Sequence, residues 1–114
     1  QDVAIQKIDG ISLISHSFTD ISGKDLNQIN ATLKAKYKDS SIIVLFARST
    51  DKVSALIQIS HNLLEKFDAS VLIKSIAADI GAKGGGGKKD FAMTGGSNPL
   101  GIKDAITTIK KQID

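Results

Sequence analysis

The sequence contains no cysteine, and this absence excludes several kinds of chemistry at once. A chain without cysteine has no disulfide framework, no thiolate zinc site and no cysteine nucleophile. Its two histidines, His16 and His61, could supply only part of a metal site or of a catalytic triad. The sequence offers neither a nucleophile beside a base nor a cluster of metal ligands. We therefore expect no catalytic residue and no metal site in this chain.

Aromatic residues and long apolar runs are also scarce. Aromatics make up 4% of the chain, too few for the stacking platforms that read single-stranded bases, so any nucleic acid would be recognised by its phosphates and shape. The longest apolar run covers residues 42–47, whereas a membrane-spanning helix needs about 20 residues. We expect no membrane partner.

What remains has the composition of one globular domain. The chain has 114 residues, of which 41% are hydrophobic and 24% charged. This length supports a single domain that buries roughly two-thirds of the surface of its unfolded form. Residue 1 is Gln rather than Met, and no charged-then-apolar signal segment follows it. We expect residues 1–114 to form one domain cut from a longer protein.

The positive charge is concentrated at one end of the chain. Residues 1–82 contain nine Lys or Arg and nine Asp or Glu, whereas residues 83–114 contain six Lys and three Asp, so they carry all of the net charge of +3. The same last quarter holds seven of the ten glycines. A small net charge usually indicates only solubility, but basic residues beside a glycine run favour an anionic partner.

Hydrophobic patterning predicts an α/β domain with a mixed sheet and about three helices. Residues 3–8 and 11–18 are β-branched and apolar, and Asp9-Gly10 between them favours a hairpin. The apolar run at 41–47 predicts a central strand covered on both faces, and residues 53–59 predict a neighbouring strand. A short strand is expected at 91–94.

Capping residues and apolar stripes mark the expected helices. A capping box at Ser22 and Asp25 opens the first helix, Asp68 caps a second that continues through Asp79, and Asn98-Pro99 opens a third. Lys34 and Lys38 are expected on the solvent side of the first helix. The expected apolar stripes are Leu26, Ile29, Leu33 and Tyr37; then Ala69, Leu72, Ile73, Ile76 and Ile80; then Ile102, Ile106, Ile109 and Ile113.

Residues 81–96, GAKGGGGKKDFAMTGG, are the segment best suited to chemistry. Four successive glycines are costly to order, so we expect them to serve a specific structural or binding purpose. Glycines at positive φ can aim consecutive amides into an anion nest, with Lys83, Lys88 and Lys89 at its rim. Two other interpretations stay open: a flexible connection with solvated lysines, or backbone packed closely against protein or ligand.

Two nucleotide-binding motifs fail on this segment. The pattern of a phosphate-binding loop fits from Ala82 to Lys88, but Lys89 stands where the magnesium-binding hydroxyl is needed. A phosphate-binding loop also follows a strand and precedes a helix, whereas in this chain a helix is expected before the loop and a strand after it. The dinucleotide fingerprint G-x-G-x-x-G fails from either Gly84 or Gly85. An ATPase or dehydrogenase is therefore disfavoured.

The segment resembles the signature of the C-terminal domain of alanyl-tRNA synthetases, which Asp-His-His phosphoesterases share in a looser form. That signature reads Gly-Gly-x-Gly-Gly-Gly-Arg-Pro-Asp-x-Ala-Gln-x-Gly-Gly. The resemblance extends from about residue 21 onward, with residues 41–47 as the central strand and 68–74 as the helix before the signature. The matching positions are Gly85, Gly86, Gly87, Asp90, Ala92, Gly95 and Gly96.

The departures from the signature bear on its contacts. One extra residue follows Gly81, and Met93-Thr94 replaces Gln-Ala. Lys88-Lys89 replaces Arg-Pro, which keeps positive charge but loses the planar fork of arginine. The phosphoesterases carry a His after the glycines, where this chain has Lys88, and this favours the synthetase branch.

The resemblance implies a non-catalytic, cytoplasmic tRNA-binding accessory domain of an alanine–tRNA ligase. Its partners would be tRNA and the other domains of the parent, which would hold the ATP and zinc sites, and this domain would carry no cofactor. Alternatives are the oligonucleotide-binding accessory domain of a phosphoesterase, or a protein interaction or dimerisation module. The expected nucleic-acid contacts are Lys83, Gly84, Gly85, Gly86, Gly87, Lys88 and Lys89, extended by Lys103, Lys110 and Lys111 if the last helix packs beside the loop.

Overall fold

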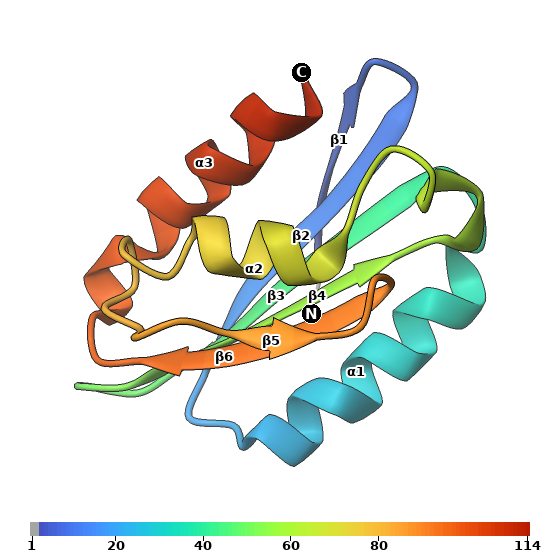
Figure 1. Ribbon diagram of the computed structural model, residues 1–114. Helices are drawn as coiled ribbons and strands as arrows, with labels where there is room; N and C mark the ends of the chain where they lie inside the picture. Colours follow the sequence, from blue (N-terminus) through green and yellow to red (C-terminus); the bar gives the residue numbers. More distant parts are fainter. Residues whose placement is uncertain (1–2) are drawn as a thin grey trace.

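The computed structural model describes residues 3–114, which form a six-stranded sheet with three helices packed on it (Figure 1). This confirms the predicted α/β class with a mixed sheet. The chain order is β1 (Ala4–Ile8), β2 (Ile11–Thr19), α1 (Gly23–Lys36), β3 (Ser41–Arg48), β4 (Val53–Ile59), a 3₁₀ turn η1 (His61–Leu63), α2 (Ala69–Ser75), β5 (Gly86–Gly87), β6 (Phe91–Gly96), a 3₁₀ turn η2 (Pro99–Gly101) and α3 (Ile102–Ile113).

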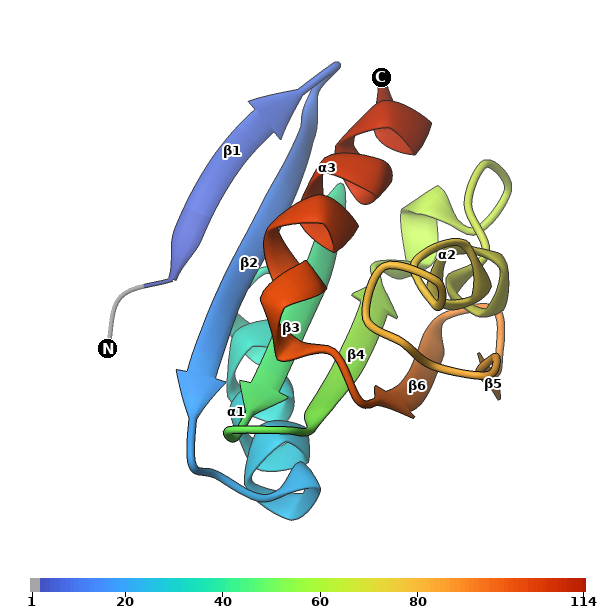
Figure 2. The same ribbon diagram turned by 90° about the vertical axis from the view of Figure 1, so that its left-hand side faces the viewer.

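The strands lie in the order β1-β2-β3-β4-β6-β5. Strands β2 and β3 are parallel and are joined through α1, because parallel neighbours need a crossover connection. The other neighbouring pairs are antiparallel. Figure 2 shows α2 and α3 together on one side of this sheet and α1 on the other, so the domain has three layers.

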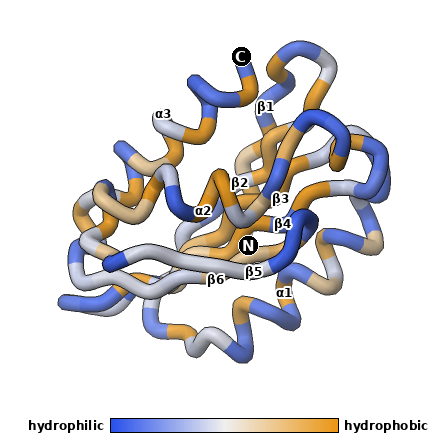
Figure 3. Tube along the Cα trace, viewed as in Figure 1, coloured by the Kyte–Doolittle hydropathy of each residue, from blue (hydrophilic) through white to orange (hydrophobic). Residues whose placement is uncertain are grey.

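Strand β3 is the centre of the core, as the apolar run predicted. Every residue from Ser41 to Ala47 is buried, because helices cover both faces of the sheet. Alternate residues of β3 enter two apolar clusters, one beneath α2 and α3 and one beneath α1. The hydropathy colouring in Figure 3 shows this apolar centre and the hydrophilic outer faces of the helices.

Local signals set the ends of several elements. The β1–β2 hairpin turns at Asp9 and Gly10, with φ values of 50° and 78°. At the start of α1, the Ser22 hydroxyl accepts a hydrogen bond from the amide of Asp25, whose carboxylate accepts one from the amide of Ser22. The predicted hairpin and capping box are therefore both confirmed.

The second helix is shorter than the sequence predicted. Asp68 caps it, accepting a hydrogen bond from the amide of Ser70, but α2 ends at Ser75 instead of continuing to Asp79. Residues 76–81 form turns instead: the amides of Ala77 and Asp79 donate to the carbonyl oxygens of Lys74 and Ile76, three residues earlier. Farther along, the Ile80 oxygen accepts a hydrogen bond from the Asn98 amide over 2.9 Å, and Ile76 and Ile80 stay buried as expected.

The last helix also begins differently from the prediction. Asn98-Pro99 opens a 3₁₀ turn, and α3 starts only at Ile102. The Asn98 side chain makes no capping bond; its amide donates to the carbonyl oxygen of Asp79 over 3.2 Å. Of the predicted apolar stripe, three isoleucines are buried and Ile106 is half-buried.

Candidate nucleic-acid interface

The glycine-lysine segment forms a hairpin at one edge of the sheet. Gly86 pairs with Met93 and Gly87 with Ala92, and the amide of Lys88 donates to the carbonyl oxygen of Phe91 over 2.7 Å to close the turn. Strand β5 is the last in the sheet order, so its outer side faces no other strand. The sequence did not predict β5, because four glycines carry no side-chain pattern.

Close backbone packing explains several of the glycines. A Cβ atom on Gly87 would collide with the backbone of Phe91 and Ala92, and one on Gly96 would collide with the carbonyl group of Ile80. One on Gly85 would lie 2.9 Å from Cβ of Thr94. Of the interpretations left open, the one confirmed is backbone packed against protein.

The tetrad does not have the backbone of the expected anion nest. Within the tetrad only Gly84 and Gly87 have positive φ, at 146° and 156°, and two residues separate them. A nest needs successive amides that converge, with right-handed and left-handed residues alternating, and both φ values are far from the left-handed value of about 57°. Any phosphate contact by this loop must depend on its lysines and on the open space beside the glycines.

That open space is a shallow groove of about 600 Å³ at one end of the hairpin. Lys83, Gly84, Gly95 and Gly96 line it from the glycine segment, and the β3–β4 turn supplies Lys52. The two segments meet because Val53 pairs with Gly96 and Ser54 with Gly95. Hydroxyl-bearing Ser54 and Ser97 also line the groove, together with Asp51, Val53 and Gly81.

Lys52 is the residue that sequence reasoning missed. It lies 31 positions before Lys83 and precedes the strand at residues 53–59, where nothing in the local pattern marks it. The signal that could have found it is the pairing of β4 with β6, which follows only from the sheet topology. Both lysines are exposed, so their ammonium groups are accessible to an anion.

Lys88 and Lys89 lie at the other end of the hairpin, in its turn. The Lys89 carbonyl oxygen accepts a hydrogen bond from the Ala69 amide at the start of α2, over 2.6 Å. Lys89 also lines a second groove, of about 430 Å³, together with Lys66, Phe67 and Val71. The three predicted lysines therefore do not surround one site: Lys83 borders the glycine groove, and Lys89 borders a different one.

The cap of α2 links Asp68 to this turn. The Ser70 hydroxyl donates to the Asp68 carboxylate over 2.6 Å, and this bond is the main reason why the pKa of Asp68 is lowered. Burial, the second-largest effect, raises the pKa, whereas the amides of Ser70 and Val71 and the positive charge of Lys89 lower it further. The charged carboxylate is favourable at the N-terminus of a helix.

The lysines of α3 are spread along that helix. Lys103 lies in its first turn, two residues after Gly101, on which a Cβ atom would collide with the Asp79 carbonyl at the base of the loop. Lys110 and Lys111 lie in the last turn, and Gln112 beside them lines the same groove as Lys89. The start of α3 thus lies near the base of the loop, and its last turn lies near the groove that Lys89 borders.

A buried polar chain supports the hairpin turn from beneath. The Asn30 amide in α1 donates to Oε1 of Gln58 over 3.0 Å, and Nε2 of Gln58 donates to the carbonyl oxygen of Asp90 over 3.1 Å. Asn30 and Gln58 are only 5% and 4% exposed. The same Asp90 oxygen accepts a bond from the Ile59 amide over 2.8 Å, so β4 holds the turn at two points.

The histidines and the remaining aromatic residues lie in different environments. His16 is half-buried, with its ring 4.5 Å from that of Phe18, and His61 is exposed. Phe91 is half-buried and packs on the cluster beneath α1, as does Tyr37. Within residues 3–114, no three potential metal ligands gather at one point. No helix in this range is long and apolar enough to cross a membrane.

The domain is thus a six-stranded mixed sheet between helical layers, with a glycine-rich hairpin at one edge. The model of the DHHA1 domain family matches residues 4–114. The chain belongs to the DHHA1 domain family.

The relatives that it matches are alanine–tRNA ligases. The enzyme of Thermotoga maritima is 36% identical over 103 residues, which cover 90% of this chain and 12% of the relative. The enzyme of Lactobacillus delbrueckii subsp. bulgaricus is 40% identical over 100 residues, which cover 86% of this chain and 11% of the relative. The chain therefore spans about an eighth of the length of these relatives.

Two solved structures share the fold. The C-Ala domain from Aquifex aeolicus alanyl-tRNA synthetase superposes with a TM-score of 0.89 at 22% identity, over 96% of this chain and 97% of that one. A protein described as a member of the s1p family of ribosomal proteins, PF0399 DHH domain, gives a TM-score of 0.65 at 22% identity, over 97% of this chain and 27% of that one.

Proposed function

We propose that this domain binds tRNA through its phosphates and serves as an accessory domain of an alanine–tRNA ligase. The proposal rests on the relatives, which carry this domain within chains about eight times its length. Aminoacylation and editing would take place in other domains of the parent, which would also hold its ATP and zinc sites. A ligase that charges tRNA would work in the cytoplasm.

The observation that carries the proposal is the glycine groove with Lys52 and Lys83 on its border. Glycines leave backbone uncovered, so the tRNA backbone can approach closely, and Lys52 and Lys83, from separate segments, would each contact a phosphate. Lys88, Lys89 and Lys103 would contact neighbouring phosphates from the hairpin turn and the start of α3. The net charge of +3 is modest, so we expect the domain alone to bind weakly.

A second candidate function is the accessory domain of an Asp-His-His phosphoesterase. The fold shared with the PF0399 DHH domain favours it. Two observations count against it: the relatives reported above are ligases, and Lys88 stands where the phosphoesterase signature has a histidine. A carboxylate and histidine metal site elsewhere in the parent chain would support the phosphoesterase, whereas a ligase body would support the synthetase.

The test is tRNA affinity measured against salt concentration. Each lysine that contacts a phosphate should contribute roughly 0.7–0.9 to the log–log slope, so Lys52→Ala and Lys83→Ala should each reduce the slope by about that amount. The matched control is Lys24→Ala, since Lys24 is exposed in the first turn of α1 and does not line the groove.

The outcomes separate the candidates. Undetectable tRNA binding at low salt would overturn the proposal and favour a protein interaction or dimerisation module, which sedimentation of the same sample would reveal. Equal slopes in all variants would remove Lys52 and Lys83 from the interface. Tighter binding to short oligonucleotides than to tRNA would favour the phosphoesterase domain.

A further inference from the structure

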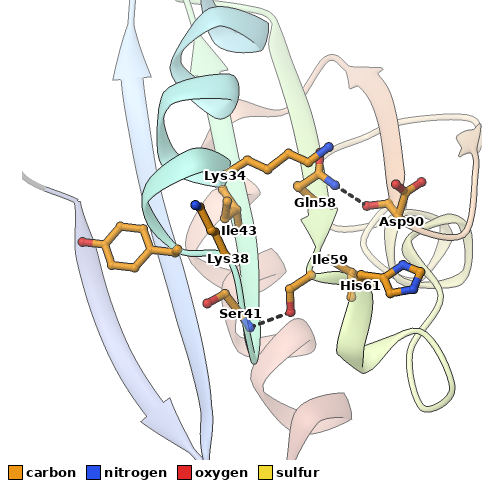
Figure 4. A pocket seen from close by; sticks show the side chains of 10 residues that line it. Lys34, Lys38, Ser41, Ile43, Gln58, Ile59, His61 and Asp90 are labelled. Carbon is orange, nitrogen blue, oxygen red and sulfur yellow. Dashed lines mark hydrogen bonds between the residues drawn. The ribbon is translucent and has the colours of Figure 1, made fainter.

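A pocket of about 280 Å³ lies at the opposite end of β4 from the glycine groove (Figure 4). Ser54 lines the groove and Gln58 lines the pocket, and four residues of strand separate them by roughly 13 Å. The pocket forms where the end of α1, the ends of β3 and β4, η1 and the hairpin turn meet. It is therefore a separate site from the proposed tRNA groove.

The pocket combines two positive charges with one negative charge. Lys34 and Lys38 line it from the end of α1, and Asp90 lines it from the hairpin turn. In Figure 4 the Lys34 side chain extends from α1 toward Gln58. Both lysines are exposed, as the sequence predicted, and both line the pocket.

The floor of the pocket is rigid and polar. Gln58 is only 4% exposed, and the bonds to Asn30 and to the Asp90 carbonyl oxygen fix both ends of its amide. Ser41 is 3% exposed, and the Ser60 hydroxyl accepts a hydrogen bond from its amide over 2.9 Å. The backbone carbonyl oxygen of Asp90 accepts two hydrogen bonds, from Gln58 and Ile59. These bonds hold the residue in place, so its carboxylate is available to a ligand.

We propose that this pocket binds the ribose and phosphate of one nucleotide. The ammonium groups of Lys34 and Lys38 bind the phosphate, which offers acceptors to both. The Asp90 carboxylate accepts a hydrogen bond from the ribose 2′-hydroxyl, a contact that distinguishes RNA from DNA. The volume equals the liquid share of about nine waters, which suits a sugar phosphate and leaves the base outside, so binding is independent of sequence.

The probe is adenosine 5′-monophosphate (AMP), titrated into the ¹⁵N-labelled protein while amide chemical shifts are followed. We expect AMP to shift the amides of Lys34, Lys38 and Ser41, and adenosine at the same concentration to leave them unchanged. Lys34→Gln and Lys38→Gln should each weaken AMP binding about three- to tenfold, the loss expected for one charge-assisted contact at a solvent-accessible site. Lys24→Gln is the matched control on the same helix.

Asp90→Asn tests the ribose contact separately. Gln58 and Ile59 bond the backbone oxygen of Asp90, so this substitution leaves the turn in place and changes only the side chain. The unsubstituted protein should bind AMP more tightly than 2′-deoxy-AMP, and Asp90→Asn, which replaces a charged acceptor by a weaker neutral one, should reduce that preference. Equal binding of the two nucleotides by the unsubstituted protein would overturn the role of Asp90.

Other outcomes bear on the pocket itself. Shifts confined to Lys52, Lys83 and Gly84, or Lys38→Gln binding AMP as tightly as the unsubstituted protein, would overturn the proposal. Lys83→Gln should weaken tRNA binding and leave AMP binding intact, so the two proposals fail independently. A 5′-phosphorylated tetraribonucleotide that binds more tightly than AMP would identify the ligand as an RNA end, and the reverse order would identify a free nucleotide; either order supports the pocket.

Discussion

The side-chain amide of Gln58 in β4 donates a hydrogen bond to the backbone carbonyl oxygen of Asp90 over 3.1 Å, and so joins the sheet interior to the turn of the glycine hairpin. The same side chain accepts a bond from Asn30 of α1. One buried glutamine thus connects the helix on one face of the sheet, the central strands and the edge hairpin.

Gln58→Leu should therefore destabilise the domain. It removes both bonds and leaves the Asn30 amide buried without an acceptor, which costs about 2 kcal/mol. Urea unfolding measures the loss, and Gln28→Leu on the exposed face of α1 is the control. A change within about 0.5 kcal/mol, as for an ordinary surface substitution, would show that the buried chain adds nothing to stability.

The glycines should differ sharply in their tolerance of alanine. Gly96→Ala places a Cβ atom against the carbonyl group of Ile80, and since backbone must then move, we expect a loss of about 3 kcal/mol or more. Gly86→Ala meets no atom within 4 Å and should cost about 1 kcal/mol or less. Thermal unfolding of the two variants makes the comparison, and equal stabilities would contradict the packing explanation.

Asp68 should make the stability of the domain depend on acid pH. Its folded pKa is lowered below the ordinary value of 3.8, so its contribution is present above that pH and is lost as pH falls through the folded pKa. Unfolding curves between about pH 5 and pH 2 should lose less stability in Asp68→Asn than in the unsubstituted protein. Parallel curves for the two proteins would show that this carboxylate does not contribute.

Lys83 and Lys89 should act independently on tRNA binding, if the proposed function holds. They border different grooves at opposite ends of the hairpin, so their phosphates would differ, and distant sites contribute additively. The double Ala variant should lower the salt slope by the sum of the two single losses, roughly 1.4–1.8. A double variant no worse than one single variant would place both lysines on the same phosphate.

The elements that the sequence predicted well are those whose signals are local. Each of three signals arises within a single strand or helix: the apolar run at 41–47, the alternation at 53–59 and the Ser22–Asp25 capping box. The early end of α2 at Ser75 could not be predicted, because Ile76 and Ile80 continue the apolar stripe of the helix and stay buried, although the backbone there changes to turns.

The candidate site shows the same division between local and distant signals. Residues 81–96 stood out by composition, yet the role of Gly87 and Gly96 depends on backbone that packs against them. The position of Lys52 beside Lys83 depends on the pairing of β4 with β6, and the burial of Asn30 depends on its partner Gln58. Such relationships between distant segments leave no periodic trace in the sequence.

Strand β5 also affects how the domain behaves in concentrated solution. A sheet edge exposes unpaired amide and carbonyl groups, which can recruit a strand from another molecule and begin aggregation. Here that edge is only two residues long, has no side chain to pack against an incoming strand, and is followed by Lys88 and Lys89. Very short edge strands and lysines are both ways in which proteins prevent such pairing. The basic, glycine-rich hairpin thus disfavours strand pairing at its own edge of the sheet, an effect that does not depend on any nucleic acid.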